Sequence, residues 1–470
     1  MNDTKLISLL QSFNSSEIKW CRIFLDSPYF NKNKKNIELF EYLVTTISKK
    51  RNNLPVREEI FKHLFPEAKY NDLKLRHLMS DLLKLLESFL VFDSLKEDIN
   101  KQNLVLLRIL RERQLNKHYQ YSMRNTKKVL DHTPQDDMFY YNKYLLQFDQ
   151  NQYYAQQQLR SNLVNLSTVN NNLEIFYQIN KLKVTNQFLN YQNVIEVKSD
   201  SKLNDDLDSL KSEKYEDIPI VQIHYLIFLS LMESENEEHF YKIIDLLDVH
   251  AHKFNIDEAR EMYTIAQNYC IKKINKGETK FLKESLSLYK TVLDKGFILE
   301  KDYLSPWHYK NIVVIGLRLN EFDWVEMFIN KYKEKISPSY RENAYTYNIA
   351  KFHFYKKEYK IVLGLLQKVE FEDIFYNLDS KTMLLKIYFE LGEINALHYL
   401  IESFELFIRR NKLIGKYHKT TYLNLIGFIK KLTNIPDGEK DKFIKIKEQI
   451  LKTKQVADIT WLIEKVESKL

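Results

Sequence analysis

The chain has 470 residues, of which 44% are hydrophobic and 29% charged, and its formal net charge is +8. Glycine and proline occur only eight times each, where average usage predicts roughly 33 and 24. Every glycine lies at Gly277 or later and no two are within ten positions, which excludes glycine-rich phosphate loops and the G-x-S-x-G nucleophile turn. Few turn formers and many amphipathic segments predict an all-α fold.

Residues 1–95 are expected to form an N-terminal helical domain, with a possible helix-turn-helix. Ser15 is the expected N-cap of a helix that the Ser27-Pro28 pair ends. Three more helices are expected at about Lys35–Ser48, at Arg57–Phe65 and from Asn71 or Asp72 to Phe92. The last of these carries a leucine stripe at helical spacing, which indicates a buried face.

Residues 96–195 are expected to form long helices, first basic and then rich in Asn, Gln and Tyr. One helix is predicted over 101–130, a range that contains eight Lys and Arg residues and a single acid, Glu112. At 100° per residue, five of these cations fall on one face: Arg113, Lys117, Arg124, Lys127 and Lys128. Such a face can follow nucleic-acid phosphates, meet an acidic protein surface, or simply be solvated.

The pattern becomes regular after a polar span at 196–217, which is the expected linker. Helical hairpins are expected over 218–300, with helices at 219–233, 237–253, 257–275 and 278–295. Residues 431–470 are expected to form capping helices. The last helix, with Ile459, Leu462 and Val466 on one face, either caps the array or docks on a partner.

Three segments between these regions repeat one another. They begin Leu319-Asn-Glu-Phe322, Lys356-Lys-Glu-Tyr359 and Leu391-Gly-Glu-Ile394, so that Phe322, Tyr359 and Ile394 recur at intervals of 37 and 35 residues. A period in this range predicts stacked helical hairpins, each too small to bury its apolar face alone.

These units, over about 301–430, resemble tetratricopeptide repeats. The resemblance covers roughly Pro306 to Phe407 and lies in the period, the apolar pattern and the aromatic residues Phe322 and Tyr359 near the turn. It departs from the family where small residues let paired helices approach, since of Val313, Ala350 and Leu385 only the alanine is small. The resemblance implies a TPR-like α-solenoid, with degenerate repeats.

The resemblance also implies a concave groove lined by the first helix of each unit. Lysines beside aromatic residues there suit an acidic or carboxylate-ended peptide, although the same lysines can be solvated and the aromatics can fill interfaces between helices. The expected lining residues are Lys310, Val314, Tyr347, Lys351, Phe354, Thr382, Lys386 and Phe389.

The N-terminal region carries a second, looser resemblance. Residues 54–90 are similar to the helical half of winged-helix regulators, which implies that Lys74, Arg76 and His77 begin a recognition helix. No hairpin wing follows. The Ser27-Pro-Tyr-Phe-Asn-Lys-Asn run with this segment resembles a family of uncharacterised Bacteroidetes proteins, which implies no function.

Motifs for chemistry are lacking in the sequence. His and acid pairs such as Glu59/His63 form no ligand set, so no catalytic residue, metal site or cofactor is expected. Cys21 and Cys270 are expected to be buried apolar side chains in a reducing compartment. No segment is long and apolar enough to enter a membrane, and the expected location is the cytoplasm. The expected function is a non-enzymatic scaffold or adaptor for a protein or peptide, and the alternative is a nucleic-acid-binding regulator.

Overall fold

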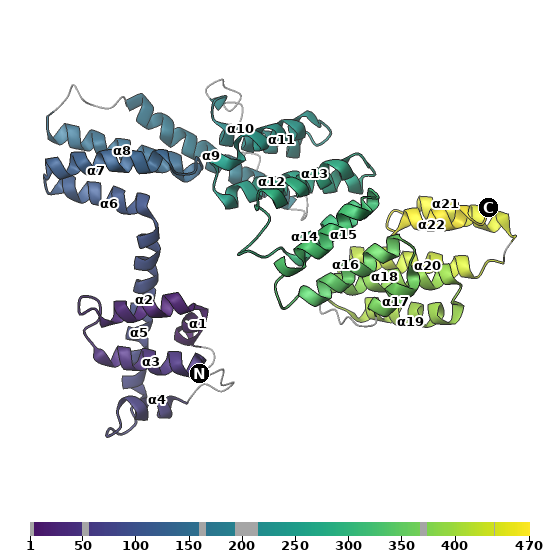
Figure 1. The fold of residues 1–470 in the computed structure, drawn as a ribbon, viewed down its shortest axis with the longest axis horizontal. Coiled ribbons are helices and arrows are strands. Elements are labelled where there is room, and N and C mark those ends of the chain that lie inside the picture. The colour runs from purple at the N-terminus through teal and green to yellow at the C-terminus, as the bar shows by residue number, and fades with distance from the viewer. Residues whose placement is uncertain (1–3, 49–55, 159–165, 193–214, 367–373, 437) are drawn as a thin grey trace. The chain divides into compact units, whose positions relative to one another are not determined.

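A computed structural model describes residues 4–48, 56–158, 166–192, 215–366, 374–436 and 438–470. These residues are helical almost throughout, as the composition predicted, and their one β feature is an isolated bridge between Glu300 and Tyr303. The chain forms two compact units, Met1–Phe228 and Leu229–Leu470. Figure 1 labels the helices in chain order. None of the helices in the described ranges is both long and apolar enough to cross a membrane.

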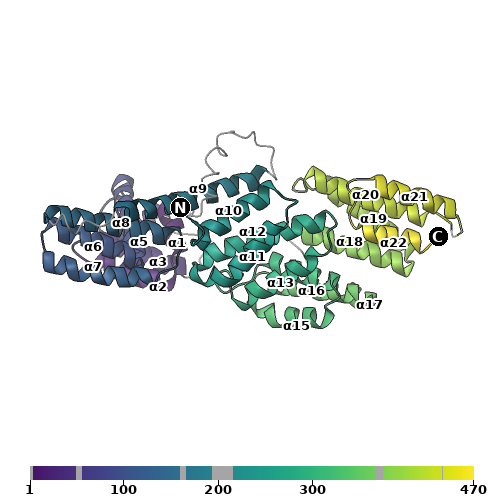
Figure 2. The same ribbon diagram turned by 90° about the horizontal axis from the view of Figure 1, so that it is seen from above.

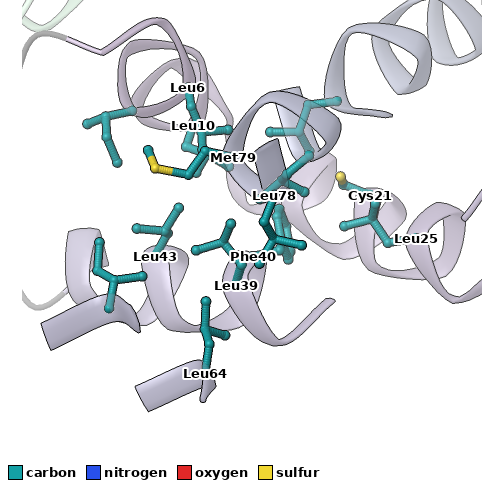
Figure 3. Close-up of a cluster of buried hydrophobic side chains, with 14 of the residues drawn as sticks. Leu6, Leu10, Cys21, Leu25, Leu39, Phe40, Leu43, Leu64, Leu78 and Met79 are labelled. Carbon is teal, nitrogen blue, oxygen red and sulfur yellow. The ribbon is translucent and has the colours of Figure 1, made fainter. Parts of the chain in front are cut away.

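The first five helices surround one hydrophobic cluster. They are α1 (Lys5–Ser12), α2 (Ser15–Asp26), α3 (Lys34–Ser48), α4 (Arg57–Leu64) and α5 (Asp72–Glu97). Figure 3 shows side chains from these helices meeting in the cluster, among them Leu10, Cys21, Phe40 and Leu78. The N-cap of α2 is Asn14 rather than Ser15, because Asn14 accepts from the Glu17 amide while the Glu17 carboxylate accepts from the Asn14 amide.

The prediction of a single helix over 101–130 is wrong, because the chain turns back within this range. Helix α6 (Ile99–Glu112) ends and α7 (Asn116–Asp131) packs against it as a hairpin. Gln114 adopts a left-handed backbone conformation, with φ of 58°, and the Leu115 amide donates to the Leu110 carbonyl. This is the Schellman arrangement that ends many helices, here built without the usual glycine.

Two long helices follow the α6–α7 hairpin in the first unit. Helices α8 (Asp137–Gln156) and α9 (Leu166–Gln192) pack along each other. The predicted linker at 196–217 lies mostly outside the described residues. Tyr215, near its end, is buried and donates to the Glu174 carboxylate at 2.8 Å.

The helices predicted over 218–300 are confirmed to within a few residues. They are α10 (Pro219–Met232), α11 (Glu238–His250), η5 (Ala251–Lys253), α12 (Ile256–Asn275) and α13 (Phe281–Asp294). Helix α12 packs against both α11 and α13, so consecutive helices form antiparallel pairs. Gly277, at φ of 96°, closes the α12 turn with the same hydrogen bond from the Glu278 amide to the Lys273 carbonyl.

Helices α14 to α19 follow the internal repeat. They are α14 (Pro306–Arg318), α15 (Phe322–Tyr332), η6 (Lys333–Lys335), α16 (Arg341–Tyr355), α17 (Tyr359–Leu366), α18 (Ile374–Leu391) and α19 (Ile394–Arg410). Each first helix packs against its own second helix, and α16 also packs against α14 and α18. Figures 1 and 2 show these helices running as neighbouring pairs.

The three repeated turns have one backbone geometry. Asn320, Lys357 and Gly392 occupy the same position of the repeat and all have left-handed φ, at 60°, 60° and 69°. The amide of the glutamate that follows each of them donates to a carbonyl five residues earlier, over 2.9–3.0 Å. The repeat therefore encodes a helix-ending turn, and only one copy uses glycine for it.

Helices α14 and α15 approach each other closely at Gly316, a position that the alignment of the internal repeats did not single out. A Cβ placed on Gly316 would lie 2.5 Å from a methyl group of Val325. Only glycine leaves room for the Val325 side chain there, so the small residue of this hairpin is one turn beyond Val313.

The remaining helices are α20 (Lys416–Thr433), α21 (Lys440–Lys452) and α22 (Ile459–Glu467). They lie beside one another in Figure 2, and α22 packs against both α20 and α21. Leu462 and Val466 of α22 are fully buried in a cluster shared with α18, α19 and α20.

Candidate functional site

The predicted groove residues lie on the first helices of three consecutive hairpins. Lys310 and Val314 are on α14, Tyr347, Lys351 and Phe354 on α16, and Thr382, Lys386 and Phe389 on α18. The spacing of three or four residues within each helix keeps each set near one face. Their surroundings, however, differ from those of an open groove.

A carboxylate that the sequence analysis did not single out joins these three first helices to α20. Asp379 of α18 forms an ion pair with Lys310 of α14 and accepts hydrogen bonds from the hydroxyls of Tyr347 and Tyr422, each at 3.3 Å. These four residues, here called the Asp379 cluster, come from the first helices α14, α16, α18 and α20. Burial and then the Asp379 carboxylate raise the pKa of Tyr347 well above its ordinary value, so its hydroxyl remains a donor.

Lys310 is also enclosed by aromatic rings. Its ammonium lies 5.4 Å, 5.6 Å and 5.2 Å from the ring centroids of Trp307, Tyr347 and Tyr376. A cation that is paired with a carboxylate and packed among three rings has little charge left to offer a ligand. Lys310 and Tyr347, the latter with no exposed surface, are therefore structural residues, which corrects their expected place in an open groove.

Lys386, the second predicted groove lysine, is buried against a segment near residue 458. Its ammonium pairs with the Asp458 carboxylate and lies 5.8 Å from the Phe354 ring and 5.4 Å from the Trp461 ring. Burial lowers the pKa of Lys386, the Asp458 carboxylate opposes this shift, and the charge of Lys351 adds to it. Lys386 is therefore a desolvated cation with one dedicated counter-ion.

Helix α22 covers the surface beside Lys386. The Trp461 ring meets the Phe389 ring edge to face, with centroids 5.4 Å apart, and its indole N–H donates to Glu390 at 3.0 Å. Lys465 pairs with the same Glu390 carboxylate at 2.7 Å. The predicted groove is thus occupied, around α18, by a helix of the same chain.

Hydrogen bonds to α20 set the position of the segment before α22. The Asn424 side-chain amide donates to the Gln455 carbonyl at 2.7 Å, and the Ala457 backbone amide donates to the Thr421 carbonyl at 3.2 Å. Asp458 itself has left-handed φ, at 51°, which turns the chain into α22 beside Lys386.

The remaining groove residues differ in accessibility. Thr382 is buried, and its hydroxyl donates to the Leu378 carbonyl of its own helix, so it was wrongly placed on an open groove. Val314, Lys351 and Phe354 are half-buried. No carboxylate in the described ranges lies within ion-pair distance of Lys351, which leaves it as the groove lysine with charge to offer.

The predicted basic face is divided by the turn at Gln114. Arg113 follows the end of α6, whereas Lys117, Arg124, Lys127 and Lys128 lie on α7. All five side chains are exposed, and none has a carboxylate partner within the described part of the chain. Tyr121, on the same helix, is 63% exposed.

A neighbouring cation of the same stretch is structural. Arg111 pairs with Asp149 of α8 at 2.9 Å, and the buried Tyr119 donates to the other oxygen of that carboxylate at 2.9 Å. Burial and the Asp149 charge raise the pKa of Tyr119. The interior of the α6–α8 packing is therefore neutral overall, while its α7 surface is cationic.

The start of α5 is more neutral than a recognition helix requires. Arg76 and Arg57 both pair with Asp72, at 2.6 Å and 3.1 Å, and the Lys74 ammonium lies 3.9 Å from the centroid of the Phe65 ring. His77 is exposed. Three of the four basic groups here already have partners within their own domain, which weakens the case for base readout.

The thiols are buried, as predicted. Burial raises the pKa of both Cys21 and Cys270 to about 12, so neither is present as a reactive thiolate near neutral pH. In the parts of the chain that the structure describes, no three His, Cys, Asp or Glu side chains gather as they would around a metal ion.

Comparison with known proteins gives no match to a family model, a curated protein or a solved structure.

Proposed function

We propose that α14–α19 form a tetratricopeptide-like array and that the protein is a non-enzymatic scaffold, binding a protein helix or acidic peptide on the α16–α18 face. The common left-handed turn at Asn320, Lys357 and Gly392 supports a repeated hairpin. The packing of α16 against α14 and α18 supports stacking of successive units.

One observation carries the proposal. Two predicted groove residues, Lys386 and Phe389, contact an acidic and an aromatic side chain at the start of α22, namely the N-cap residue Asp458 and Trp461. The surface therefore has the chemistry to bind a helix of this kind by charge and ring contact. Lys351, whose ammonium lies 6.0 Å from the centroid of the Phe354 ring that Lys386 also approaches, has no carboxylate partner among the described residues and supplies further charge for an incoming acidic segment.

Photocrosslinking tests this proposal. A photoreactive side chain placed at Lys351 in the full chain should crosslink a protein partner, and the same group at Lys360 should not. Lys360 is an exposed lysine on the second helix of the same hairpin. The partner should resist nuclease treatment, and Lys351→Glu should weaken its binding about tenfold. Partners that disappear with nuclease, or crosslink equally at both positions, would contradict the scaffold function.

The exposed cations of α7 favour a second candidate, a nucleic-acid-binding regulator. Lys117, Arg124 and Lys128 are exposed on one helix, with no carboxylate partner in the described ranges, and the exposed Tyr121 could stack on a base. Binding of a labelled single-stranded oligonucleotide should then weaken steeply with salt. Reversing Arg113, Lys117 and Arg124 to glutamate should abolish it. A salt-independent affinity would rule out phosphate contacts by this helix.

A further inference from the structure

The side chains of α22 and of its N-cap residue that meet α18 form a regular pattern. Trp461 and Lys465 are four residues apart and share one face of α22, and Asp458, the N-cap residue with left-handed φ, precedes them. Leu462 and Val466, each one residue further along, are fully buried in the cluster shared with α18, α19 and α20.

Each of these three residues has its own partner on α18. Lys386 pairs with Asp458, Phe389 packs on Trp461, and Glu390 pairs with Lys465. The order of charges is opposite on the two segments: acid, aromatic and base from the N-cap of α22 onward, against base, aromatic and acid on α18. A surface with this order discriminates against a helix that lies in the reverse direction, because reversal would place like charges together.

We propose that α22 is an internal ligand of the α16–α18 surface, and that the partner is a helix carrying the same acid, tryptophan and base spacing, which binds in its place. This inference rests on the proposed scaffold function. It names the partner's chemistry and the regulation of its site: the partner and α22 exclude each other.

Lys351 explains how a partner can displace a segment that is already tethered. Its ammonium and that of Lys386 lie 6.0 Å and 5.8 Å from the centroid of the same Phe354 ring, yet no carboxylate of α22 pairs with Lys351. A partner helix with a second acid near the first would pair with Lys351 as well. That extra contact is the differential interaction that a competing ligand requires.

The test uses a fluorescent peptide of residues 454–470 and the full chain. Trp461→Ala in the chain removes the ring contact of α22 and leaves Lys386, Phe389 and Glu390 intact. The peptide should bind this variant at least about tenfold more tightly than the unaltered chain, in which the tethered α22 competes at high effective concentration. The control Leu451→Ala, at an exposed position of α21, should bind like the unaltered chain. A peptide lacking the tryptophan should lose binding to every chain.

An exchange of charges between chain and peptide distinguishes a loss of binding from misfolding of the variant. A chain carrying Lys386→Glu should bind a peptide with lysine at the Asp458 position in preference to the unaltered peptide. Circular dichroism of each variant checks that helical content is kept. Equal peptide binding to the Trp461→Ala and unaltered chains would overturn the proposal. So would a dimer of the unaltered chain that the peptide dissociates, since a second copy would then be the occupant.

Failure of this inference is distinguishable from failure of the scaffold function. If Lys351 crosslinks a protein to the same extent with and without Trp461→Ala, α22 is not an internal ligand, but the scaffold function is still supported. Absence of any protein crosslink from Lys351 would remove the scaffold itself.

Discussion

The α6–α7 hairpin and the α14–α18 helices carry similar basic side chains in different surroundings. On α7, Lys117, Arg124 and Lys128 are exposed and have no carboxylate partner in the described residues. On α14 and α18, Lys310 and Lys386 are enclosed by rings and paired with aspartates. Exposed cations attract any polyanion and are screened by salt, whereas desolvated pairs recognise one geometry. Burial therefore decides which kind of partner a basic helix can select.

Both regions nevertheless contain a partly buried carboxylate that joins a cation to a tyrosine. Asp149 holds Arg111 and Tyr119 in the first unit, and Asp379 holds Lys310, Tyr347 and Tyr422 in the second. In both clusters the carboxylate compensates a mostly buried cation, so we expect both to lose stability in the same way when that carboxylate is removed.

The largest effect is expected from removing either carboxylate charge. Asp379→Asn and Asp149→Asn should each lower the free energy of unfolding by about 2–3 kcal/mol, because each leaves a mostly buried cation without its counter-ion. Urea unfolding monitored by circular dichroism measures this loss. A change below about 0.5 kcal/mol in either variant would show that the cluster is solvated.

The shared left-handed turn predicts a smaller, stabilising effect. Gln114→Gly and Lys357→Gly should each raise the free energy of unfolding by roughly 0.5–1 kcal/mol, because glycine adopts this backbone conformation without the penalty that Cβ imposes. Gly364 provides the control with the reverse substitution, because it lies within α17 and has open space around it. Gly364→Ala should also stabilise, by a similar amount, since there glycine is the less favourable residue. Destabilisation by both glycine variants would contradict the turn geometry.

A pH dependence separates buried from exposed lysines. Burial lowers the pKa of Lys386 below its unfolded value of 10.5, so the unfolded chain binds more protons in the window just below 10.5. The free energy of unfolding should accordingly rise with pH there, relative to that of a Lys386→Met variant. Thermal unfolding of both chains between about pH 8 and 10 tests the sign. A relative fall would mean that Asp458 outweighs burial.

The smallest effects are expected on α7. Lys117→Ala, Arg124→Ala and Lys128→Ala should each change the free energy of unfolding by less than about 0.5 kcal/mol, since none of these side chains makes an ion pair with a described residue. The same urea experiment measures them. A loss above about 1 kcal/mol would place that cation in a contact that stabilises the fold.

Local patterns predicted most of the helices, and their failures have physical reasons. Apolar spacing and polar breaks located the helices between Pro219 and Asp294 well. The break at Gln114 was missed because the turn is made by backbone hydrogen bonds and a left-handed glutamine, with no glycine or proline to mark it.

The candidate site was predicted less completely, because its contacts join distant residues. The repeat alignment placed Lys310, Tyr347, Lys386 and Phe389 near one face, but it could not show that Asp379 and Asp458 neutralise the lysines. Asp379 does depart from the repeat, since Trp307 and Ala344 hold the same position in the earlier units. That departure was the available sign of a polar role.

The Asp379 cluster also has a mechanical consequence. A force that pulls α14 away from α18 must break the Lys310–Asp379 pair and part the rings around Lys310 at the same moment. Hairpins held by apolar contacts alone can slide past one another in smaller steps. We therefore expect the packing of α14, α16 and α18 to yield last when the second unit is stretched, and to act as its stiff segment.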